Sequence, residues 1–258
     1  MTGEPADDAD VKKAKGSINR LSLWFKPWFY EHARALLKTG LKRSAADISA
    51  CSEPVFSEFI PLRDYYHRHS RSIFWQMAEI VPFGNHVLFR WLLGWLLPIK
   101  ISLLKLTTPD SLTHIYESRF VFQDMLVPMA SLERSLQYFH DEFAMYPLWL
   151  CPHQVFRTEP QGMLQPANSS LKVGEFEMFV DIGAYGMPPK KPFDARQAVR
   201  RVEKFVAAEK GFQMLYADTY MNKDELRAMF NHTLYDRMRT KYEAATAFPD
   251  VFTKVRKV

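Results

Sequence analysis

The sequence contains few cysteines and no long hydrophobic run. Cys51 and Cys151 are the two cysteines among 258 residues, which predicts neither a disulfide framework nor a cysteine-based zinc site and favours a reducing, cytosol-facing environment. No run of about eighteen apolar residues occurs, because the best candidate, 87–97, is interrupted by Arg90 and ended by Pro98. The first 20 residues lack the apolar core of a signal peptide. We therefore expect no signal peptide and no transmembrane segment in this chain.

Glycine is also scarce, and its spacing excludes the common nucleotide-binding signatures. The chain has 10 glycines, and the closest spacing, Gly183-Ala-Tyr-Gly186, does not match a dinucleotide or phosphate loop. The sequence has no P-loop lysine, no nucleophile elbow and no His-Glu-x-x-His motif. The net charge of +5 permits an anionic partner, but the basic residues are dispersed. A nucleic-acid partner is therefore not expected.

The chain is instead rich in aromatic residues, and one segment concentrates them. Residues 65–106 begin with a cluster of histidine and arginine, continue through tryptophan, phenylalanine and leucine, and end on Lys100 and Lys105. A soluble domain seldom exposes so much apolar surface beside cations unless that surface meets something apolar and anionic, or another protein domain. This segment has to be explained by any function assigned to the chain.

Hydrophobic periodicity predicts two different halves. In the first half, a helix begins after Pro27 and is expected to stop at Gly40, and two short helices are expected within 70–80 and 86–97. In the second half, the pattern predicts strands at 120–127, 147–151, 175–182 and 212–216, helices at 131–143, 194–210 and 222–242, and a long loop at 154–173.

The order of these elements predicts an α+β fold. A β-α-β unit followed by a loop and a second β-α-β unit is typical of a ferredoxin-like, split βαβ antiparallel sheet backed by helices. An additional N-terminal helical region precedes it. We expect a disordered tail at 1–20, a helical and aromatic-rich region at 21–118, and an α+β domain at 119–258.

The cluster around Tyr66, His67 and His69 is the first candidate site. Two histidines two residues apart would share one face of a strand and reach a zinc ion, but no third ligand lies nearby in the sequence, so no metal site is predicted. Two interpretations stay open: a polar pocket in which arginines contact an anion and Tyr or His donates hydrogen bonds, and polar residues packed between two helices.

The exit of the last expected strand is the second candidate site. Tyr216, Asp218 and Tyr220 follow one another closely there, and a rigid strand that ends in polar residues is a common place for chemistry. The alternative is a turn stabilised by Asp218, with Asn222 capping the next helix.

Several ordered blocks resemble the delta-24-sterol reductase family. The similarity extends from about Trp24 to Phe252. The blocks that carry it are 65–69 (YYHRH), 72–75 (SIFW), 82–85 (PFGN), 100–107 (KISLLKLT), 123–128 (QDMLVP), 181–186 (DIGAYG) and 211–218 (GFQMLYAD).

The resemblance implies a flavoprotein of the vanillyl-alcohol-oxidase type. Such enzymes reduce the C24–C25 double bond of a sterol with FAD and NADPH, on the cytosolic face of the endoplasmic reticulum membrane. Their FAD-binding half and membrane anchor precede the matched region, so this chain is expected to be the C-terminal substrate and cap portion. Without the FAD-binding domain it is expected to bind neither cofactor tightly and to be inactive alone, because the hydride chemistry belongs to the flavin.

The resemblance also gives roles to the candidate residues. A sterol needs an apolar, aromatic pocket or a contact with the membrane surface, and this role falls to Phe74, Trp75, Phe83, Trp91 and Trp95. Reduction of the double bond needs a proton donor, for which Tyr66, His67, His69, Tyr216, Asp218 and Tyr220 are the candidates. The alternative is a non-catalytic sterol-binding or membrane-associated interaction protein derived from such an enzyme.

Overall fold

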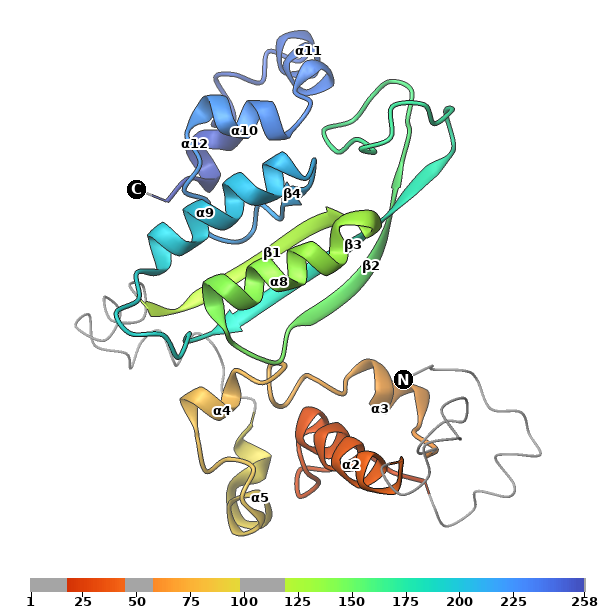
Figure 1. Cartoon of the computed structure of the whole chain (residues 1–258), viewed down its shortest axis with the longest axis vertical. Helices are drawn as coiled ribbons and strands as arrows, with labels where there is room; N and C mark the ends of the chain where they lie inside the picture. Colours follow the sequence, from red (N-terminus) through yellow and green to blue (C-terminus); the bar gives the residue numbers. More distant parts are fainter. Residues whose placement is uncertain (1–17, 45–57, 98–118, 258) are drawn as a thin grey trace. The chain divides into compact units, whose positions relative to one another are not determined.

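A computed structural model describes residues 18–44, 58–97 and 119–257 of the chain (Figure 1). The chain divides into two compact units, 1–107 and 108–258. Most of the expected tail, both cationic residues that end the 65–106 segment, and Cys51 lie outside the described residues.

The second unit contains one four-stranded sheet. Its strands are β1 (Val121–Pro128), β2 (Trp149–Phe156), β3 (Phe176–Gly186) and β4 (Phe212–Gln213), in the spatial order β2-β3-β1-β4. All neighbouring pairs are antiparallel, so β1 and β2 run in the same direction with β3 between them. Helix α8 (Leu132–Phe143) connects β1 to β2, and α9 (Ala195–Ala208) connects β3 to β4. The predicted α+β fold with a split βαβ sheet is therefore confirmed.

Three strand boundaries differ from the prediction. Strand β2 continues to Phe156, beyond the expected end at Cys151, because it pairs with β3 along its whole length from Trp149↔Gly183 to Phe156↔Phe176. Strand β3 likewise continues to Gly186 opposite Val121. Strand β4 is shorter than predicted, since only Phe212 and Gln213 pair with β1 before the chain turns. Pairing with a neighbouring strand decides these ends, and no local sequence pattern reports it.

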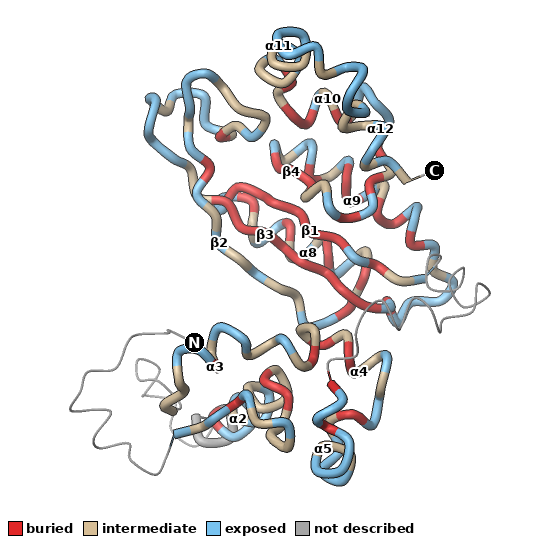
Figure 2. The backbone as a smooth tube through the Cα atoms, turned by 180° about the vertical axis from the view of Figure 1, so that it is seen from behind, coloured by how far each residue is buried: buried red, intermediate tan, exposed pale blue. Residues whose placement is uncertain are grey.

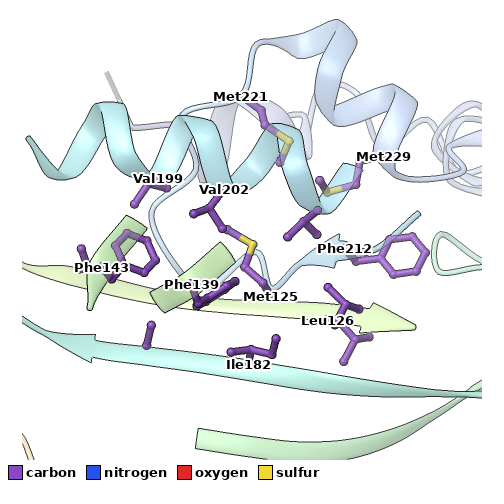
Figure 3. Close-up of a cluster of buried hydrophobic side chains, with 14 of the residues drawn as sticks. Met125, Leu126, Phe139, Phe143, Ile182, Val199, Val202, Phe212, Met221 and Met229 are labelled. Carbon is purple, nitrogen blue, oxygen red and sulfur yellow. The ribbon is translucent and has the colours of Figure 1, made fainter. Parts of the chain in front are cut away.

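Both crossover helices lie on one face of the sheet, where they bury a common core (Figures 1 and 3). Met125 of β1 pairs with Ile182 of β3, and both side chains are fully buried toward the helices (Figure 3). The spacing of apolar residues in α8 and α9 explains why each helix buries one face. The labelled helix residues of this core are Phe139, Phe143, Val199 and Val202.

Side-chain caps define where the later helices begin. Asp194 accepts a hydrogen bond from the backbone N–H of Gln197 at the start of α9 (3.0 Å), and Asn222 and Glu225 form a capping box at the start of α10 (Lys223–Met229). The cap by Asn222 was one of the two interpretations of its segment. Helices α11 (Thr233–Lys241) and α12 (Val251–Val255) complete the unit.

The first unit is built from short helices. It contains α2 (Phe29–Ser44), α3 (Leu62–Tyr66), α4 (Met77–Ile80), α5 (Val87–Leu93) and the 3₁₀ helix η1 (Gly94–Leu96). The prediction that α2 stops at Gly40 is wrong, because the backbone of Gly40 is helical. The helix expected within 70–80 is mostly a series of turns, in which Ile73 and Phe74 adopt positive φ angles of 45° and 60°.

Arginines hold the turns of this unit together. Arg71 donates to the carbonyl oxygens of Leu21 (2.6 Å) and Trp24 (2.8 Å), and Arg90 donates to that of Phe25 (2.7 Å). Both guanidinium groups therefore satisfy backbone groups far away in sequence, which compensates for the small amount of regular structure. The unit also has a small core of Trp28, Met77 and Leu97.

The core of the second unit generates a prediction about stability. Phe139 is 1% exposed and packs edge-to-face on Phe143. We expect Phe139→Ala to lower the free energy of unfolding by about 3–5 kcal/mol, because it removes the transfer energy of the ring and leaves a cavity. Urea unfolding followed by circular dichroism measures this. Glu133→Ala on the exposed side of the same helix is the control, and it should change the stability by less than about 0.5 kcal/mol. Equal effects of the two substitutions would contradict the assigned core.

Candidate active site

The sheet face opposite α8 and α9 carries buried acidic and phenolic side chains. Side chains alternate along a strand, so the neighbours of Met125 and Ile182 point away from the helices. Those neighbours are Asp124 on β1 and Asp181 on β3, which are 0% and 5% exposed. Tyr185 belongs to the same face of β3 and is also buried. Figure 2 shows that β1 and β3 are buried along most of their length, whereas the edge strand β2 is more exposed.

Asp124 is held by two tyrosines. The hydroxyl group of Tyr185 donates a hydrogen bond to its Oδ1, and that of Tyr216 donates to its Oδ2 (2.7 Å). Tyr216 comes from the segment after β4, and its side chain is largely exposed although its hydroxyl group reaches the buried carboxylate. Each oxygen of Asp124 therefore has a donor, which favours the ionised form of this group.

Gly183 makes the contact between Tyr185 and Asp124 possible. It lies opposite Asp124 in the sheet register, on the same face. A Cβ atom at this position would lie 2.5 Å from the Tyr185 hydroxyl oxygen and 2.7 Å from Oδ1 of Asp124. Glycine is thus required by the close approach of two side chains.

Asp181 differs from Asp124 in having no hydrogen-bond donor among the residues that the structure describes. Its Oδ1 is buried and accepts no hydrogen bond from any described residue. Burial, together with the charge of Asp124, raises the pKa of Asp181 to about 7. Burial also raises the pKa of Asp124, although the bonds from the two tyrosines act in the opposite direction. The pair therefore favours one proton, and the geometry favours Asp181 as its carrier.

The tyrosines remain protonated. Burial and the carboxylate of Asp124 raise the pKa of both Tyr185 and Tyr216 above the ordinary value. Cys151 of β2 lies directly opposite Asp181 in the register and is a free, half-buried thiol. The face thus combines a carboxyl group held by two phenolic donors with a second carboxyl group that has a raised pKa and no such donors among the described residues.

Of the three residues predicted at the strand exit, Tyr216 joins this cluster, while Asp218 and Tyr220 have other contacts. The carboxylate of Asp218 pairs with Lys257 at 2.7 Å, and its backbone oxygen accepts hydrogen bonds from the amides of Gln123 (2.8 Å) and Gln213 (2.9 Å). The ring of Tyr220 lies against Arg196. These contacts are those of a fixed turn, the alternative interpretation of this segment.

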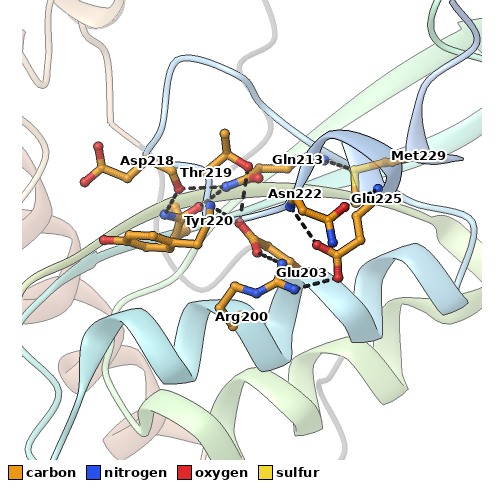
Figure 4. A network of polar contacts seen from close by, with 10 residues as sticks. Arg200, Glu203, Gln213, Asp218, Thr219, Tyr220, Asn222, Glu225 and Met229 are labelled. Carbon is orange, nitrogen blue, oxygen red and sulfur yellow. Dashed lines mark hydrogen bonds and ion pairs between the residues drawn. The ribbon is translucent and has the colours of Figure 1, made fainter. Parts of the chain in front are cut away.

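Glu203 of α9 holds the same turn in place (Figure 4). Its side chain is 1% exposed and accepts hydrogen bonds from the backbone N–H of Tyr220 (2.8 Å) and from Arg200 (2.7 Å), with Thr219 at 3.3 Å. Arg200 also bonds Glu225 at 2.6 Å. Burial raises the pKa of Glu203, while these partners stabilise its charge. This buried carboxylate is fully compensated and ties the turn to the helix.

The histidine cluster of the first unit does not form a single site. Tyr66 ends α3 and is 71% exposed, and His67 is also exposed. His69 stacks on Phe74 with ring centroids 5.0 Å apart and meets the edge of Phe29 at 5.2 Å. Burial, with a smaller contribution from Arg68, lowers the pKa of His69 to about 4. Among the described residues, no group of three His, Cys, Asp or Glu side chains is placed to hold a metal ion.

The aromatic residues expected to contact a sterol or a membrane have different environments. Trp75 is buried, and Phe74 lies in the stack with His69. Phe83, Trp91 and Trp95 are exposed to between 59% and 63%. Trp91 also stacks on Phe25, with ring centroids 4.7 Å apart. The last three are thus the members of the set that are available to a ligand or surface.

Sequence reasoning did not assign roles to Asp124, Asp181 and Tyr185. Their signal was an acidic residue inside each of two otherwise apolar strands, in the stretches QDMLV and FVDIGAY. A charged residue is rarely buried in a central strand unless it is paired or functional. The pairing of β1 with β3, which sequence alone did not supply, was needed to bring the two acids to one face.

The close approach at Gly183 generates a second prediction. Gly183→Ala should destabilise the fold by about 1–3 kcal/mol, because the new methyl group overlaps the Tyr185 ring and the Asp124 carboxylate. Gly162→Ala is the control, since its Cβ would meet no atom closer than 4.0 Å, and it should be neutral or stabilising. Chemical denaturation of both variants measures the difference. Equal tolerance of the two substitutions would contradict the described packing.

Comparison with known proteins identifies relatives along the entire chain. Human Delta(24)-sterol reductase is 45% identical over 257 residues, which are 100% of this chain and 45% of the human protein. The Delta(24)-sterol reductase homolog of Caenorhabditis elegans is 43% identical over 99% of the chain and 44% of its own length. The Arabidopsis thaliana Delta(24)-sterol reductase is 38% identical over the whole chain and 45% of its own length.

No family model and no solved structure matches the chain. The chain spans about half the length of the relatives it matches. The resemblance predicted from the sequence blocks is confirmed, and the chain is related along its whole length to the Delta(24)-sterol reductases.

Proposed function

We propose that this chain is the sterol-handling portion of a Delta(24)-sterol reductase. In this role it binds the sterol and presents the C24–C25 double bond to a hydride donor held by another part of the enzyme. The observation that carries the proposal is the similarity to these reductases from end to end. The acidic and phenolic face of the sheet supports it, because reduction of a double bond consumes a proton as well as a hydride.

The described residues do not fit the dinucleotide cofactors that the resemblance implies. The common phosphate cradle of dinucleotide-binding folds is a glycine-rich turn that leads from a strand into the N-terminus of a helix. The described glycines with positive φ are Gly174 and Gly186, and neither is at the start of a helix. We therefore place the binding of FAD and NADPH, and the hydride transfer, outside the residues described.

The proposal predicts that this chain can replace the matching segment of a relative. The human enzyme carrying this chain in place of its own segment should reduce a sterol with a C24–C25 double bond, as measured by mass spectrometry of the product. The human enzyme with the segment deleted is the negative control. A chimera that is folded and flavin-loaded but yields no product would refute the proposal. Tight, stoichiometric FAD binding by the isolated chain would contradict the placement of the cofactor.

A second candidate function is favoured by the exposed surface of α5 and η1. The apolar side chains there are unusually accessible, with Leu88 at 64%, Leu92 at 70% and Trp95 at 63% exposure. Among the described residues, no helix is long and apolar enough to cross a bilayer. An exposed apolar helix surface is typical of segments that lie in the interface of a membrane instead. This is the membrane-associated, non-catalytic alternative.

The charge pattern of the sequence around α5 and η1 supports a lipid surface as the partner. The sequence has no acidic residue from Ile80 to Pro109, whereas it contains Arg90, Lys100 and Lys105. The indole N–H of Trp95 donates to the carbonyl oxygen of Leu92 at 3.1 Å, so its burial in lipid would leave no unpaired donor. In the complete enzyme the same face would place the sterol-handling part at the membrane, where the substrate is dissolved. Location at the endoplasmic reticulum is part of this proposal.

Vesicle binding tests this face directly. Leu92→Asp should reduce co-sedimentation with phosphatidylcholine–phosphatidylserine vesicles at least tenfold, because a charge must enter the interface with the helix. Leu37→Asp is the matched control, since Leu37 is 65% exposed on α2 and should leave binding unchanged. Equal loss in both variants, or no binding by the unmodified chain, would count against a membrane contact at α5.

A further inference from the structure

We propose that Asp181 is the acid that delivers a proton to the double bond of the substrate, and that Asp124, fixed between Tyr185 and Tyr216, is the charge that positions this proton. The site depends on the geometry of the sheet. The identity of the substrate rests on the proposed function above. The acid assignment and the substrate assignment can fail separately, because titration of the chain tests the first without the second.

The two carboxyl groups lie on the same face of adjacent central strands. Asp124 is opposite Gly183, and Asp181 is two residues before that glycine, so the acids are diagonal neighbours. Diagonal neighbours in a sheet have Cα atoms about 7–8 Å apart, within reach for two carboxylates to repel each other across a buried face. Two such groups are not ionised together without cost, and one proton shared by the pair removes that cost.

The surroundings of the two acids are unequal, which decides where the proton resides. Asp124 accepts one hydroxyl hydrogen bond on each oxygen, whereas Oδ1 of Asp181 is buried with no partner among the described residues. Donors stabilise a carboxylate, and an apolar, unpartnered environment stabilises the neutral acid. Environments that separate the pKa values of two carboxyl groups in this way assign one group as the acid and the other as the base in active sites.

Among the described residues, the groups that interact electrostatically with Asp181 lie on β1 and β3 and after β4, and none of them is a cation. The groups that raise its pKa are its burial and Asp124 on β1, and Cys151 of β2 lies opposite it in the register. The charge of Asp181 in turn contributes to the raised pKa of Tyr185 on β3 and of Tyr216 after β4. With a pKa of about 7, Asp181 carries its proton in a large fraction of molecules at neutral pH, as a general acid must.

The other candidate acids are less suited to donate a proton. The hydroxyl protons of Tyr185 and Tyr216 are engaged with Asp124, and their raised pKa values oppose release. His69, a candidate in the sequence, is neutral near pH 7 because its pKa is lowered to about 4. Asp218 pairs with Lys257.

The carboxyl O–H bond of Asp181 breaks, and its proton forms a C–H bond with one carbon of the double bond. A hydride from a donor of the dihydroflavin or dihydronicotinamide class, bound outside the described residues, forms the second C–H bond. The double bond is reduced, the donor is oxidised, and Asp181 is left as a carboxylate that regains its proton from solvent.

Titration of the chain tests the acid without any cofactor. In the 258-residue chain labelled with ¹³C at the aspartate carboxyl carbons, one resonance should titrate near pH 7 and disappear in Asp181→Asn. In Asp124→Asn the same resonance should titrate at lower pH, because the neighbouring charge is gone. Asp141→Asn at an exposed position is the control and should leave it unchanged. An Asp181 that titrates near the ordinary value of 3.8 overturns the proposal.

Substitution of a tyrosine tests whether Asp124 positions the proton. A purely structural role of the tyrosines would leave the pKa values of the two aspartates unchanged. Tyr216→Phe removes one donor from Asp124. In the same titration the pKa of Asp124 should therefore rise and that of Asp181 should fall. Tyr138→Phe is the control, because the Tyr138 hydroxyl group makes only a 3.5 Å contact with a backbone oxygen of α9. Unchanged titration of both aspartates in Tyr216→Phe would overturn the positioning role of Asp124.

Activity in the chimera completes the test. Asp181→Asn should lower kcat by about 10²–10⁴-fold with little change in KM, the range for loss of a general acid. Asp181→Glu should recover part of the rate. If the chimera is active and Asp181→Asn is equally active, the acid assignment is overturned while the proposed function stands. If the chimera is inactive but the titration near pH 7 is found, the proposed function fails and the acidic pair remains.

Discussion

The antiparallel register between β1 and β3 is the constraint on which the candidate site depends. A slip of one residue would turn every side chain of β1 to the opposite face of the sheet. Asp124 would then enter the core between sheet and helices, and Met125 would leave it. The same register places Gly183 opposite Asp124, where the absence of a Cβ atom lets Tyr185 reach the carboxylate. Core packing and site assembly are thus set by one pairing.

The apolar face and the polar face of the sheet support each other. Met125 and Ile182 fill the space beneath the helices and support the register of the strands, which fixes the positions of the residues beside them. A site built on central strands is held more rigidly than one built on loops. The exposed part of the cluster is Tyr216, which comes from the connection after β4 and reaches Asp124 from outside the sheet.

The sequence predicted the order of the elements better than their ends or their partners. The apolar periodicity of α8 and α9 reports burial of one helix face, and that signal is local. The ends of β2 and β4 depend on how far a neighbouring strand extends, and this information lies elsewhere in the chain. The same limit explains the site. Tyr216 was recognised as a polar residue at a strand exit, but its partner Asp124 lies 92 residues away in sequence.

Two buried carboxylates in one unit show the difference between a structural and a functional acid. Glu203 is 1% exposed, and Arg200, Thr219 and a backbone N–H compensate its charge. Asp181 is almost equally buried, yet its Oδ1 has no partner among the described residues and its nearest acidic neighbour repels it. Burial of an uncompensated acid costs stability. The residues on either side of Asp181, Val180 and Ile182, are apolar, as expected for a central strand. Such a cost is typical of positions that serve chemistry, which is why the unpaired acid, and not the paired one, is the centre of the site.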